Sequence, residues 1–336
     1  MCCPLRLERE GLPTDESCQL TREKRVVAVL PGFARPMLEG RLPEWVEARW
    51  WLSVEELHRL APEAEIGWFD MHEKPPLLRA VELAQGLKWL NSVYAGLDFL
   101  PLDELRERRV LLTNGTGLTA IQVSEFAVLG MLAIAKNYPA VVRAQGRHEW
   151  LSTAPGIRDL AGSKALILGL GAIGKRIAAA LEGFGVEVTA VRRHQAEGVL
   201  TPGEWRGRLR EFDWIVLAVP GTPETEGMIG TGELAAMKRE AVLVNFARAN
   251  VVDQAALVDA LRDRRIFAAM LDVTDPEPLP ADHPLWELDN AHITMHLSGI
   301  PTPQSMARAV DRFLENCGRY RRGEPLEPRF DVSLGY

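Results

Sequence analysis

The chain has 336 residues, of which 47% are hydrophobic and 25% charged, the balance of an ordinary globular protein with apolar material for two domains. Its formal net charge of −7 provides no general attraction to nucleic acid or to an anionic membrane, and no apolar run approaches the roughly 18 residues of a membrane helix. The four cysteines form no CxxC pair, so we expect no disulfide framework, no metal site and a reducing, cytoplasmic location.

Residues 1–24 are predicted to be a loose leader, because the stretch is charged, is broken by prolines and glycine, and lacks the apolar core of a signal peptide. Short apolar runs then alternate with amphipathic stretches such as Leu77–Ala84. This rhythm predicts parallel strands with helices on both faces of a sheet. The strands of this first series are expected at Val26–Leu30, Ala64–Phe69, Leu87–Val93 and Val110–Leu112, whereas residues 31–60 indicate only apolar packing.

A change of organisation is predicted near residue 117. The flexible stretch Asn114–Gly117 is followed by a long apolar helix, expected at Ile121–Lys136 and ending near Tyr138 and Pro139. A glycine-containing loop that runs into a long helix is typical of a hinge between domains. Trp150 lies beyond this helix. We interpret it as a buried packing residue, and the alternative is that it reaches a neighbouring subunit's pocket.

A second series of strands and helices follows the hinge. The residue patterns predict helices at Ala172–Leu181, at Asp253–Arg262 with Asp253 as N-cap, and at Thr302–Tyr320. Strands are expected at Lys164–Leu168, Val186–Val191, Trp214–Val219, Ala241–Asn245, Phe267–Leu271 and Ala291–Thr294. We therefore predict an α/β fold of two similar parallel-sheet domains, Rossmann-like or flavodoxin-like, with a cleft between them.

The strongest single motif is a glycine loop between a predicted strand and a predicted helix. Gly169, Gly171 and Gly174 form G-x-G-x-x-G around Ala172 and Ile173, directly after Lys164–Leu168. In this context the first glycine permits a tight turn, the second lets a pyrophosphate approach the backbone, and the third lets the helix pack close to the strand. The motif predicts a dinucleotide site at a helix N-terminus.

The end of the second strand in this series bears on the choice of nucleotide. An NAD site usually carries Asp or Glu there to bind the ribose 2′-hydroxyl, whereas this chain has Arg192 and Arg193. A carboxylate would repel a 2′-phosphate, and a guanidinium binds one with charge-assisted hydrogen bonds. We therefore predict that NADP(H) is preferred and that NAD(H) remains possible as a cofactor.

Three later strand ends carry groups suited to the reduction of a carbonyl. Asn245–Arg248, Leu271–Pro278 and Ile293–His296 each leave a predicted strand, and ligands of α/β sheets bind at the carboxyl ends of strands. An arginine can hold a substrate carboxylate and polarise a carbonyl, and a histidine can donate a proton near neutral pH. A carboxylate beside the histidine would favour its protonated form.

In their order along residues 85–320, these motifs resemble the D-isomer-specific 2-hydroxyacid dehydrogenase family. The segments that carry the resemblance are Leu87–Leu90, Ala95–Asp98, Val123–Glu125, Leu160–Gly162 with the glycine loop, Pro220–Thr225, Asn245–Arg248, Leu271–Val273, Glu277–Pro278 and His283–Trp286. The two arginines are similar to those of the NADPH-preferring glyoxylate and hydroxypyruvate reductases within the family. The resemblance thus implies reduction of a small 2-keto acid to the D-2-hydroxy acid.

The resemblance also implies roles for individual residues. Arg248 is expected to bind substrate, His296 to donate the proton and Glu277 to pair with that histidine. The backbone of Tyr94, Ala95, Gly96 and Leu97 is expected to receive the substrate carboxylate. Expected contacts to the cofactor, besides the glycine loop and the two arginines, come from Pro220, Thr225, Phe246 and Asp272, of which Asp272 would help to hold the nicotinamide carboxamide.

The family architecture implies a substrate domain at residues 1–117 and 298–336, a cofactor domain at 118–297, and a homodimer joined through the cofactor domain. The chain departs from the family pattern at Ala249, Met295 and Thr274, where Gly, Pro and a bulky aromatic are usual, and this affects the expected shape of the pocket. Two alternatives stay open, a formate dehydrogenase-like member and a nucleotide-sensing, corepressor-like binding protein of the same fold.

Overall fold

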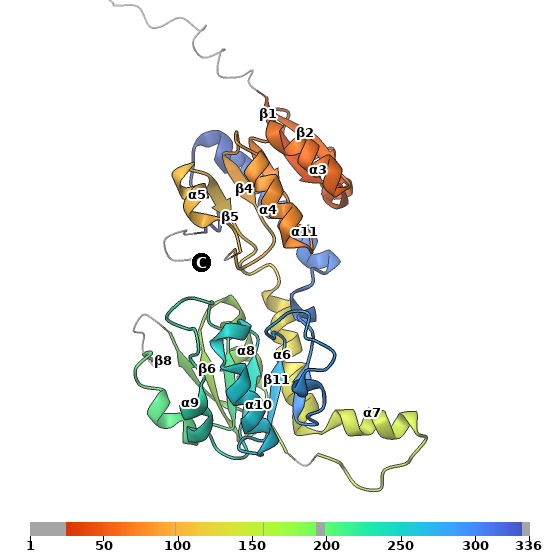
Figure 1. Ribbon diagram of the computed structural model, residues 1–336, viewed down its shortest axis with the longest axis vertical. Helices are drawn as coiled ribbons and strands as arrows, with labels where there is room; N and C mark the ends of the chain where they lie inside the picture. Colours follow the sequence, from red (N-terminus) through yellow and green to blue (C-terminus); the bar gives the residue numbers. More distant parts are fainter. Residues whose placement is uncertain (1–24, 98, 157, 193–198, 331–336) are drawn as a thin grey trace, which may run out of the picture. The chain divides into compact units, whose positions relative to one another are not determined.

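The computed structural model describes residues 25–97, 99–156, 158–192 and 199–330. The chain divides into two compact units, each described by itself below (Figure 1). Unit 1 comprises the described residues up to Ser92 together with Asp103–Thr113 and Val310–Glu327, and unit 2 comprises Val93–Leu102, Asn114–Ala309 and the residues from Pro328 onward. The domain boundaries expected from the family, 117/118 and 297/298, stay a prediction.

Unit 1 is built on a parallel sheet, sheet A, of five strands in the order β2-β1-β3-β4-β5. This 2-1-3-4-5 order is that of flavodoxin-like folds. The strands are β1 (Val26–Pro31), β2 (Val46–Trp51), β3 (Ile66–Trp68), β4 (Trp89–Asn91) and β5 (Leu111–Thr113). The helices that accompany them are α2 (Arg35–Leu38), α3 (Val54–Leu60), α4 (Lys74–Leu83), α5 (Leu102–Glu107) and the C-terminal α11 (Pro303–Arg322), with short 3-10 turns at Gly32–Ala34 and Ala61–Glu63.

Helix α11 brings the C-terminal part of the chain onto sheet A. Phe313 is fully buried and stacks on Trp89 with ring centroids 5.1 Å apart, and it also meets Trp68 at 5.5 Å. Large aromatic side chains bury much apolar surface, and such ring pairs add to that stabilisation. The packing explains how both ends of the described chain contribute to one core.

Unit 2 is built on a parallel sheet, sheet B, of seven strands in the order β12-β11-β10-β9-β6-β7-β8. Read from β8 to β12, with β6 counted as strand 1, this is the 3-2-1-4-5-6 order of a Rossmann fold with a seventh strand, β12, at the end. Its strands are β6 (Lys164–Leu168), β7 (Glu187–Val191), β8 (Val199–Leu200), β9 (Trp214–Leu217), β10 (Val242–Asn245), β11 (Ala268–Leu271) and β12 (Ala291–Ile293). The two parallel α/β sheets confirm the predicted fold class.

Helices cover both faces of sheet B. They are α6 (Ala120–Ala135), α7 (Tyr138–Gly146), α8 (Ala172–Gly183), α9 (Thr231–Ala236) and α10 (Gln254–Arg262), with 3-10 turns at Arg206–Glu211, Ala249–Val251, Pro284–Trp286 and Leu297–Gly299. Alternate side chains of β6 pack on opposite faces of sheet B. Ala165 and Ile167 pack with α6 and α8, whereas Leu166 and Leu168 pack with α9 and α10. A strand with both faces buried reads as a continuous apolar run, which is why this one was predictable from sequence.

Most predicted elements are confirmed, with ends shifted by a few residues. Asp253 caps α10 as expected, because its carboxylate accepts a hydrogen bond of 3.0 Å from Ala256 N. Strand β2 was missed. It lies at the edge of sheet A with β1 as its neighbour, so it tolerates the half-exposed Glu47 and the exposed Arg49 among its apolar residues. Because two charged residues interrupt its apolar residues, the segment does not have the continuous apolar pattern expected of a buried strand.

The segment after the long helix also differs from the prediction. Helix α6 ends at Ala135, Asn137 turns the chain with φ 46°, and Pro139 lies in the first turn of a further helix, α7. Proline is well suited to a first helical turn, where its missing N–H costs nothing. In Figure 1, α7 extends away from sheet B as an arm, which we define as residues 138–155.

The structure also bears on the cysteines, on membrane helices and on metal-ligand clusters. Of the cysteines, Cys317 is buried with its pKa raised to about 12 by that burial, and Cys2, Cys3 and Cys18 lie outside the described residues. Within the described ranges, no single helix is long and apolar enough to cross a membrane; α6 and α7 reach that length only together, with a bend of 73° between them. No cluster of three His, Cys, Asp or Glu side chains that would suit a metal ion occurs in the same ranges.

Candidate active site

The glycine loop connects β6 to α8 at the point where the strand order of sheet B reverses. Gly169 has φ 101°, and a Cβ atom there would lie 2.4 Å from Ala218 O. At Gly174 a Cβ atom would lie 1.9 Å from Gly169 O. No L-side chain fits at either position, so the two glycines are required by the turn and by the close packing of helix on strand.

Gly171 differs from these two glycines. A Cβ atom on Gly171 would have nothing within 4 Å, and the residue is the N-cap of α8. Ala172 is exposed and Ile173 half-buried in the first turn. The first N–H groups of a helix lack partners within it and favour an anion. An open space over a bare helix N-terminus fits a dinucleotide pyrophosphate, which these backbone groups would hold.

Arg192 follows β7 directly. Its side chain is exposed, and its backbone N–H donates to Leu200 O at 3.1 Å, which joins β7 to β8. The backbone at the end of β7 lies beside the glycine loop, because Gly169 N–H donates to Val191 O at 3.0 Å. Arg193 lies outside the described residues. The expected role of the two arginines in binding a 2′-phosphate stays a prediction.

The remaining predicted cofactor residues differ in what their side chains do. Thr225 is buried and closes a turn, since its hydroxyl donates to Pro220 O at 2.7 Å and accepts from Thr222 N at 2.9 Å. Phe246 is also buried and packs in the core cluster beneath α6 and α8. A contact from Phe246 to the cofactor would therefore come from its backbone, and these roles stay predictions.

Asp272 is the hub of a hydrogen-bond network at the end of β11. The side chain is 3% exposed, its Oδ1 accepts from Thr294 Oγ1 at 2.7 Å, and its Oδ2 accepts a short bond from Ser298 Oγ. Its backbone oxygen accepts from His296 N at 2.6 Å. The carboxylate thus binds a residue on each side of His296, Thr294 and Ser298. The sequence did not indicate this role, which is separate from the expected contact with the nicotinamide carboxamide.

His296 and Glu277 form an ion pair, 19 residues apart in the chain. The distance between His296 Nδ1 and Glu277 Oε2 is 2.8 Å, and the side chains are 48% and 39% exposed. Because Nδ1 is engaged, Nε2 is the ring atom that can deliver a proton to a ligand. A half-exposed pair of this kind is accessible to substrate while still shielded enough for the two charges to interact.

The pKa values of the two groups shift in opposite directions. The hydrogen bond with Glu277 raises the pKa of His296 against the effect of partial burial, and the negative charges of Glu277 and Asp272 act in the same direction. Burial would raise the pKa of Glu277, but the hydrogen bond and charge of His296 outweigh it and lower that pKa. The positive charge of Arg248 lowers the pKa of both groups. The pair is thus arranged to favour the protonated form of the imidazole.

Arg248 follows β10 and is held by its surroundings. Its Nη1 donates to Ala247 O at 2.9 Å, and a side chain on Gly221 would come within 2.8 Å of Arg248 Cγ. Asn245, 1% exposed, supports the turn, since its amide donates to Arg248 O at 3.1 Å and accepts from Ala247 N at 3.0 Å. The structure therefore brings Arg248, Glu277 and His296 within electrostatic range of one another.

The expected substrate-carboxylate loop, Tyr94–Leu97, is supported by the stretch that was predicted as a hinge. Gly115 N donates to Tyr94 O at 2.7 Å, and the Asn114 side chain donates to Ala95 O at 2.7 Å. A Cβ atom on Gly115 would lie 1.8 Å from Val93 O. Glycine at 115 is therefore needed for close approach of two backbones, which local sequence patterns did not indicate.

A second support was also missed from sequence. Gln254, at the start of α10, accepts a hydrogen bond from Asp275 N at 2.9 Å and donates to Asp275 O at 2.5 Å. The loop that it anchors carries Glu277, whose Oε1 accepts from Thr274 N at 3.1 Å. Such amide contacts join segments that are distant in sequence, and no motif marks them. Chemically, the assembled groups offer a proton donor, a fixed cation and an anion site.

Comparisons with known proteins find relatives over most of the chain. The family model described as D-isomer specific 2-hydroxyacid dehydrogenase, NAD binding domain, matches residues 128–298. The human glyoxylate reductase/hydroxypyruvate reductase is 35% identical over 254 residues, which cover 71% of this chain and 76% of that protein. Two relatives named D-3-phosphoglycerate dehydrogenase, from Methanocaldococcus jannaschii and Archaeoglobus fulgidus, share 33% and 31% identity over 74% and 75% of this chain. The chain spans about half of their length, 48% and 49%.

Solved structures extend the likeness to both units. A D-isomer specific 2-hydroxyacid dehydrogenase family protein of Aeromonas salmonicida matches with a TM-score of 0.82 at 30% identity, over 92% of this chain and 99% of that one. A D-isomer specific 2-hydroxyacid dehydrogenase of Xanthobacter autotrophicus, in complex with NADPH and MES, matches with a TM-score of 0.72 at 28% identity, over 93% and 100%. The chain belongs to the D-isomer specific 2-hydroxyacid dehydrogenase family.

Proposed function

We propose that this protein is an NADPH-preferring reductase of small 2-keto acids of the glyoxylate and hydroxypyruvate type, forming the D-2-hydroxy acid. The observation that carries the proposal is the 2.8 Å His296–Glu277 ion pair with Arg248 within electrostatic range, all at carboxyl ends of strands in sheet B. A general acid beside a fixed cation is what the reduction of a 2-keto acid requires.

Each group has a defined part in this chemistry. When bound, the reduced nicotinamide supplies the hydride. Arg248 binds the substrate carboxylate and polarises the C2 carbonyl, because a guanidinium stays charged and can bond two oxygens at once. His296 donates the proton from Nε2 to the oxygen as negative charge develops there. Glu277 keeps the imidazole protonated and oriented through its 2.8 Å bond to Nδ1.

The preference for NADPH rests on Arg192 and on the absence of an acid at the end of β7. The Xanthobacter structure that holds NADPH gives a precedent within the family. Loss of a charge-assisted bond to a 2′-phosphate reduces affinity by about 10-fold or more. We therefore expect Arg192→Ala combined with Arg193→Ala to lower kcat/KM for NADPH by that factor and to leave the value for NADH almost unchanged.

The test follows the absorbance of NADPH and of NADH separately, with glyoxylate, hydroxypyruvate and 3-phosphohydroxypyruvate as substrates. Oxidation that is faster with NADPH and with the two unphosphorylated acids is the expected result. Faster oxidation of NADH would overturn the cofactor proposal alone. A preference for the phosphorylated acid would move the substrate toward that of the relatives named D-3-phosphoglycerate dehydrogenase. Binding of nucleotide without turnover would favour the corepressor-like alternative.

A formate dehydrogenase-like activity has less support. Formate dehydrogenases of Granulicella and Staphylococcus aureus match in structure at 23% and 24% identity, and likeness at that level reflects the fold alone. In this chain the residues on either side of His296 are Met295 and Leu297. Formate and NAD, tested in the same assay, should give no turnover. The cytoplasmic location expected from the cysteines stays a prediction.

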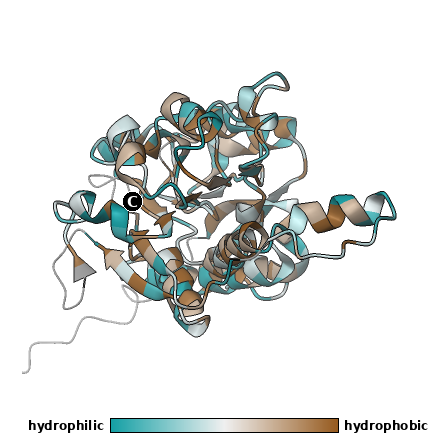
Figure 2. Cartoon of the chain, turned by 90° about the horizontal axis from the view of Figure 1, so that it is seen from below, coloured by the Kyte–Doolittle hydropathy of each residue, from teal (hydrophilic) through white to brown (hydrophobic). Residues whose placement is uncertain are grey.

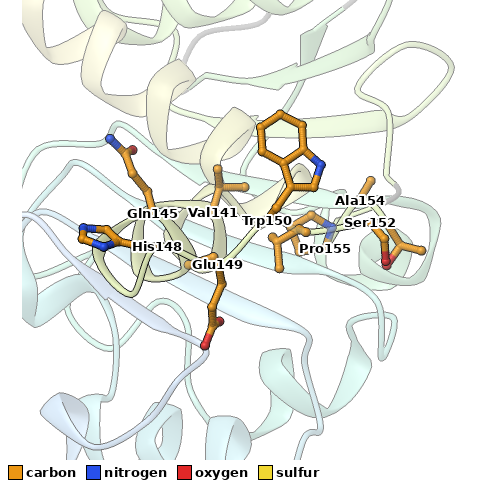
Figure 3. Close-up of a pocket in the computed structure, with 11 residues that line it drawn as sticks. Val141, Gln145, His148, Glu149, Trp150, Ser152, Ala154 and Pro155 are labelled. Atoms are coloured by element: carbon orange, nitrogen blue, oxygen red, sulfur yellow. The ribbon is translucent and has the colours of Figure 1, made fainter.

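We also propose that the protein is a homodimer joined through unit 2. The arm bears large exposed apolar side chains, including Tyr138 at 56%, Val142 at 49% and Trp150 at 96%, so the interpretation of Trp150 as buried is wrong. Figure 2 shows apolar residues along the projecting helix, and Figure 3 labels Trp150 among the residues that line a pocket on the arm. The volume of this pocket is about 680 Å³. Such surface on a projecting element is suited to a partner.

A second copy of the chain is the partner that this proposal names, in line with the family. Sedimentation analysis should give a mass near twice 37.4 kDa for the parent protein. Val142→Glu together with Trp150→Glu should shift it toward the monomer, because charges would be buried without partners. A monomeric parent protein would refute the proposal.

A further inference from the structure

We propose that Gln122, on α6, is a positioning residue that sets the place of His296 in the proposed reaction. It acts through the backbone of the segment that follows the histidine. The inference rests on the proposed function for its kinetic consequence and on geometry alone for its structural one.

The segment around His296 cannot hold its own position by regular structure. Met295 and His296 both have left-handed backbone conformations, with φ of 53° and 57°. L-residues rarely adopt this region, so the surroundings must impose it. Before the histidine, Thr294 is tied to the end of β11, with its N–H donating to Leu271 O at 2.9 Å. The N–H of His296 itself donates to Asp272 O at 2.6 Å, which holds its backbone at that point. The direction in which the ring leaves this point depends further on what holds the chain after it.

Gln122 provides that second anchor. Its side chain is 9% exposed, and its Nε2 donates to Ser298 O at 2.9 Å and to Ile300 O at 2.5 Å. The first of these bonds joins residues 176 positions apart in the chain. Ser298 is also tied to Asp272 through its hydroxyl and its N–H. His296 is therefore part of a short arc that is fixed at Thr294 on one side and at Ser298 and Ile300 on the other.

The anchor comes from a rigid helix. Val123 and Ala127 of α6 are buried in the core of unit 2, and the helix lies so close to β11 that a Cβ atom on Gly130 would lie 2.4 Å from the Met270 side chain. A close-packed helix can hold a distant loop in place, since packed interiors transmit displacement rather than absorb it. The amide of Gln122 transfers that rigidity to the arc.

The choice of an amide at this position has a structural cost. Gln122 Oε1 is buried and has no hydrogen-bond partner among the described residues. An apolar side chain of the same length would avoid that buried acceptor, and burial of an unpaired polar atom is unfavourable. What the amide offers in return is its two donors, both directed at the arc that carries His296.

The test compares the parent chain with two variants. Gln122→Met keeps the length of the side chain and removes both N–H donors. Gln122→Asn keeps the amide but, because the side chain is shorter, moves it away from Ser298 O and Ile300 O. Gln304→Met, at an exposed position on α11, is the matched control. Two quantities are measured. One is kcat and KM with glyoxylate, and the other is the pKa of His296 by NMR, assigned with a His296→Asn variant.

For Gln122→Met we expect kcat to fall by about 10- to 100-fold, because displacement of a reacting group by about 1 Å costs this much. KM for the nucleotide and the melting temperature should change little. The pKa of His296 should fall toward its ordinary value, since the arc no longer holds the ring against Glu277, while Asp272 and Arg248 remain in place. Gln122→Asn should give the same changes in smaller measure.

A parent-like kcat together with a parent-like pKa of His296 in a folded Gln122→Met protein would overturn the inference. If that variant does not fold, Gln122→Asn decides the matter by the same two readings. If the parent chain reduces no keto acid, the proposed function fails, but the NMR reading still distinguishes the two cases: a lowered pKa of His296 upholds the positioning role and an unchanged pKa refutes it.

Discussion

The carboxyl edges of the two sheets use their polar side chains in opposite ways. At the edge of sheet A, Asp70 is 6% exposed, and its carboxylate accepts from Trp68 Nε1 at 3.0 Å and from Ser92 Oγ at 2.7 Å. At the edge of sheet B, His296 and Glu277 are 48% and 39% exposed and bind each other at 2.8 Å. Both edges have buried strands behind them and carry an acid at a strand end.

The difference lies in what each acid can still do. The oxygens of Asp70 are engaged by neighbours of its own sheet, and buried polar groups satisfied in this way stabilise one local structure. Glu277 instead shifts the pKa of a histidine that is open to a ligand. An acid at a strand end is thus a poor indicator of function by itself. Its exposure and its partner decide the matter.

Removing the proton donor of sheet B should have the largest effect. We expect His296→Asn to lower kcat by roughly 10²- to 10⁴-fold with glyoxylate and NADPH, because general acid catalysis contributes about that factor. Nucleotide binding should persist. His58→Asn, on α3, is the control and should retain parent activity. Near-normal turnover of His296→Asn would show that the pair at sheet B is structural, as at sheet A.

Removing the cation should come next. Arg248→Met should reduce kcat/KM by on the order of 10²- to 10³-fold, since a group that stabilises developing negative charge contributes about that much. Steady-state kinetics should show KM for the keto acid rising while kcat falls. Arg210→Met, at an exposed position, serves as control. A change confined to the nucleotide KM would contradict the assignment of Arg248 to substrate.

Neutralising the acid of sheet B should change the pH profile more than the maximum rate. Reduction requires protonated His296, so activity is present below the pKa of His296 and lost as pH rises through it. Glu277 raises that pKa, so Glu277→Gln should move the alkaline limb of log kcat to lower pH and reduce kcat at pH 7 by about 10-fold. Glu182→Gln, exposed on α8, should leave the limb in place. If the alkaline limb of log kcat does not move in Glu277→Gln, Glu277 does not raise the pKa of the group that donates the proton.

The matching change in sheet A should appear in stability. Asp70→Asn turns one acceptor into a donor that faces either the indole N–H or the Ser92 hydroxyl, and the unfolding free energy should fall by about 1–3 kcal/mol. Urea unfolding followed by tryptophan fluorescence measures it, with exposed Asp282→Asn as control. The pH limb of kcat should not move. If the alkaline limb moves in Asp70→Asn as it does in Glu277→Gln, the conclusion that Asp70 is structural and Glu277 functional is wrong.

The parts of the fold that could be predicted were those in which local pattern is sufficient. The run Lys164–Leu168 followed by three spaced glycines allowed few structures other than strand, tight turn and helix, and the structure confirms them. The edge strand Val46–Trp51 was not recognised, because Glu47 and Arg49 interrupt the continuous apolar run by which the buried strands were identified. Residues 138–146 were missed as a helix, since Pro139 reads as an end as readily as a first turn.

By itself the sequence determined the family, the two-sheet class and the identities of the groups suited to chemistry, because strand periodicity, glycine spacing and side-chain type are local properties. The tertiary structure alone decided how the groups are held. The family resemblance implied that Glu277 pairs with His296, but the bonds of Asp272 to Thr294 and Ser298 and the two bonds of Gln122 were not anticipated. They join residues 22 to 178 positions apart. Such contacts depend on which faces the packed helices present, and no local pattern encodes that choice.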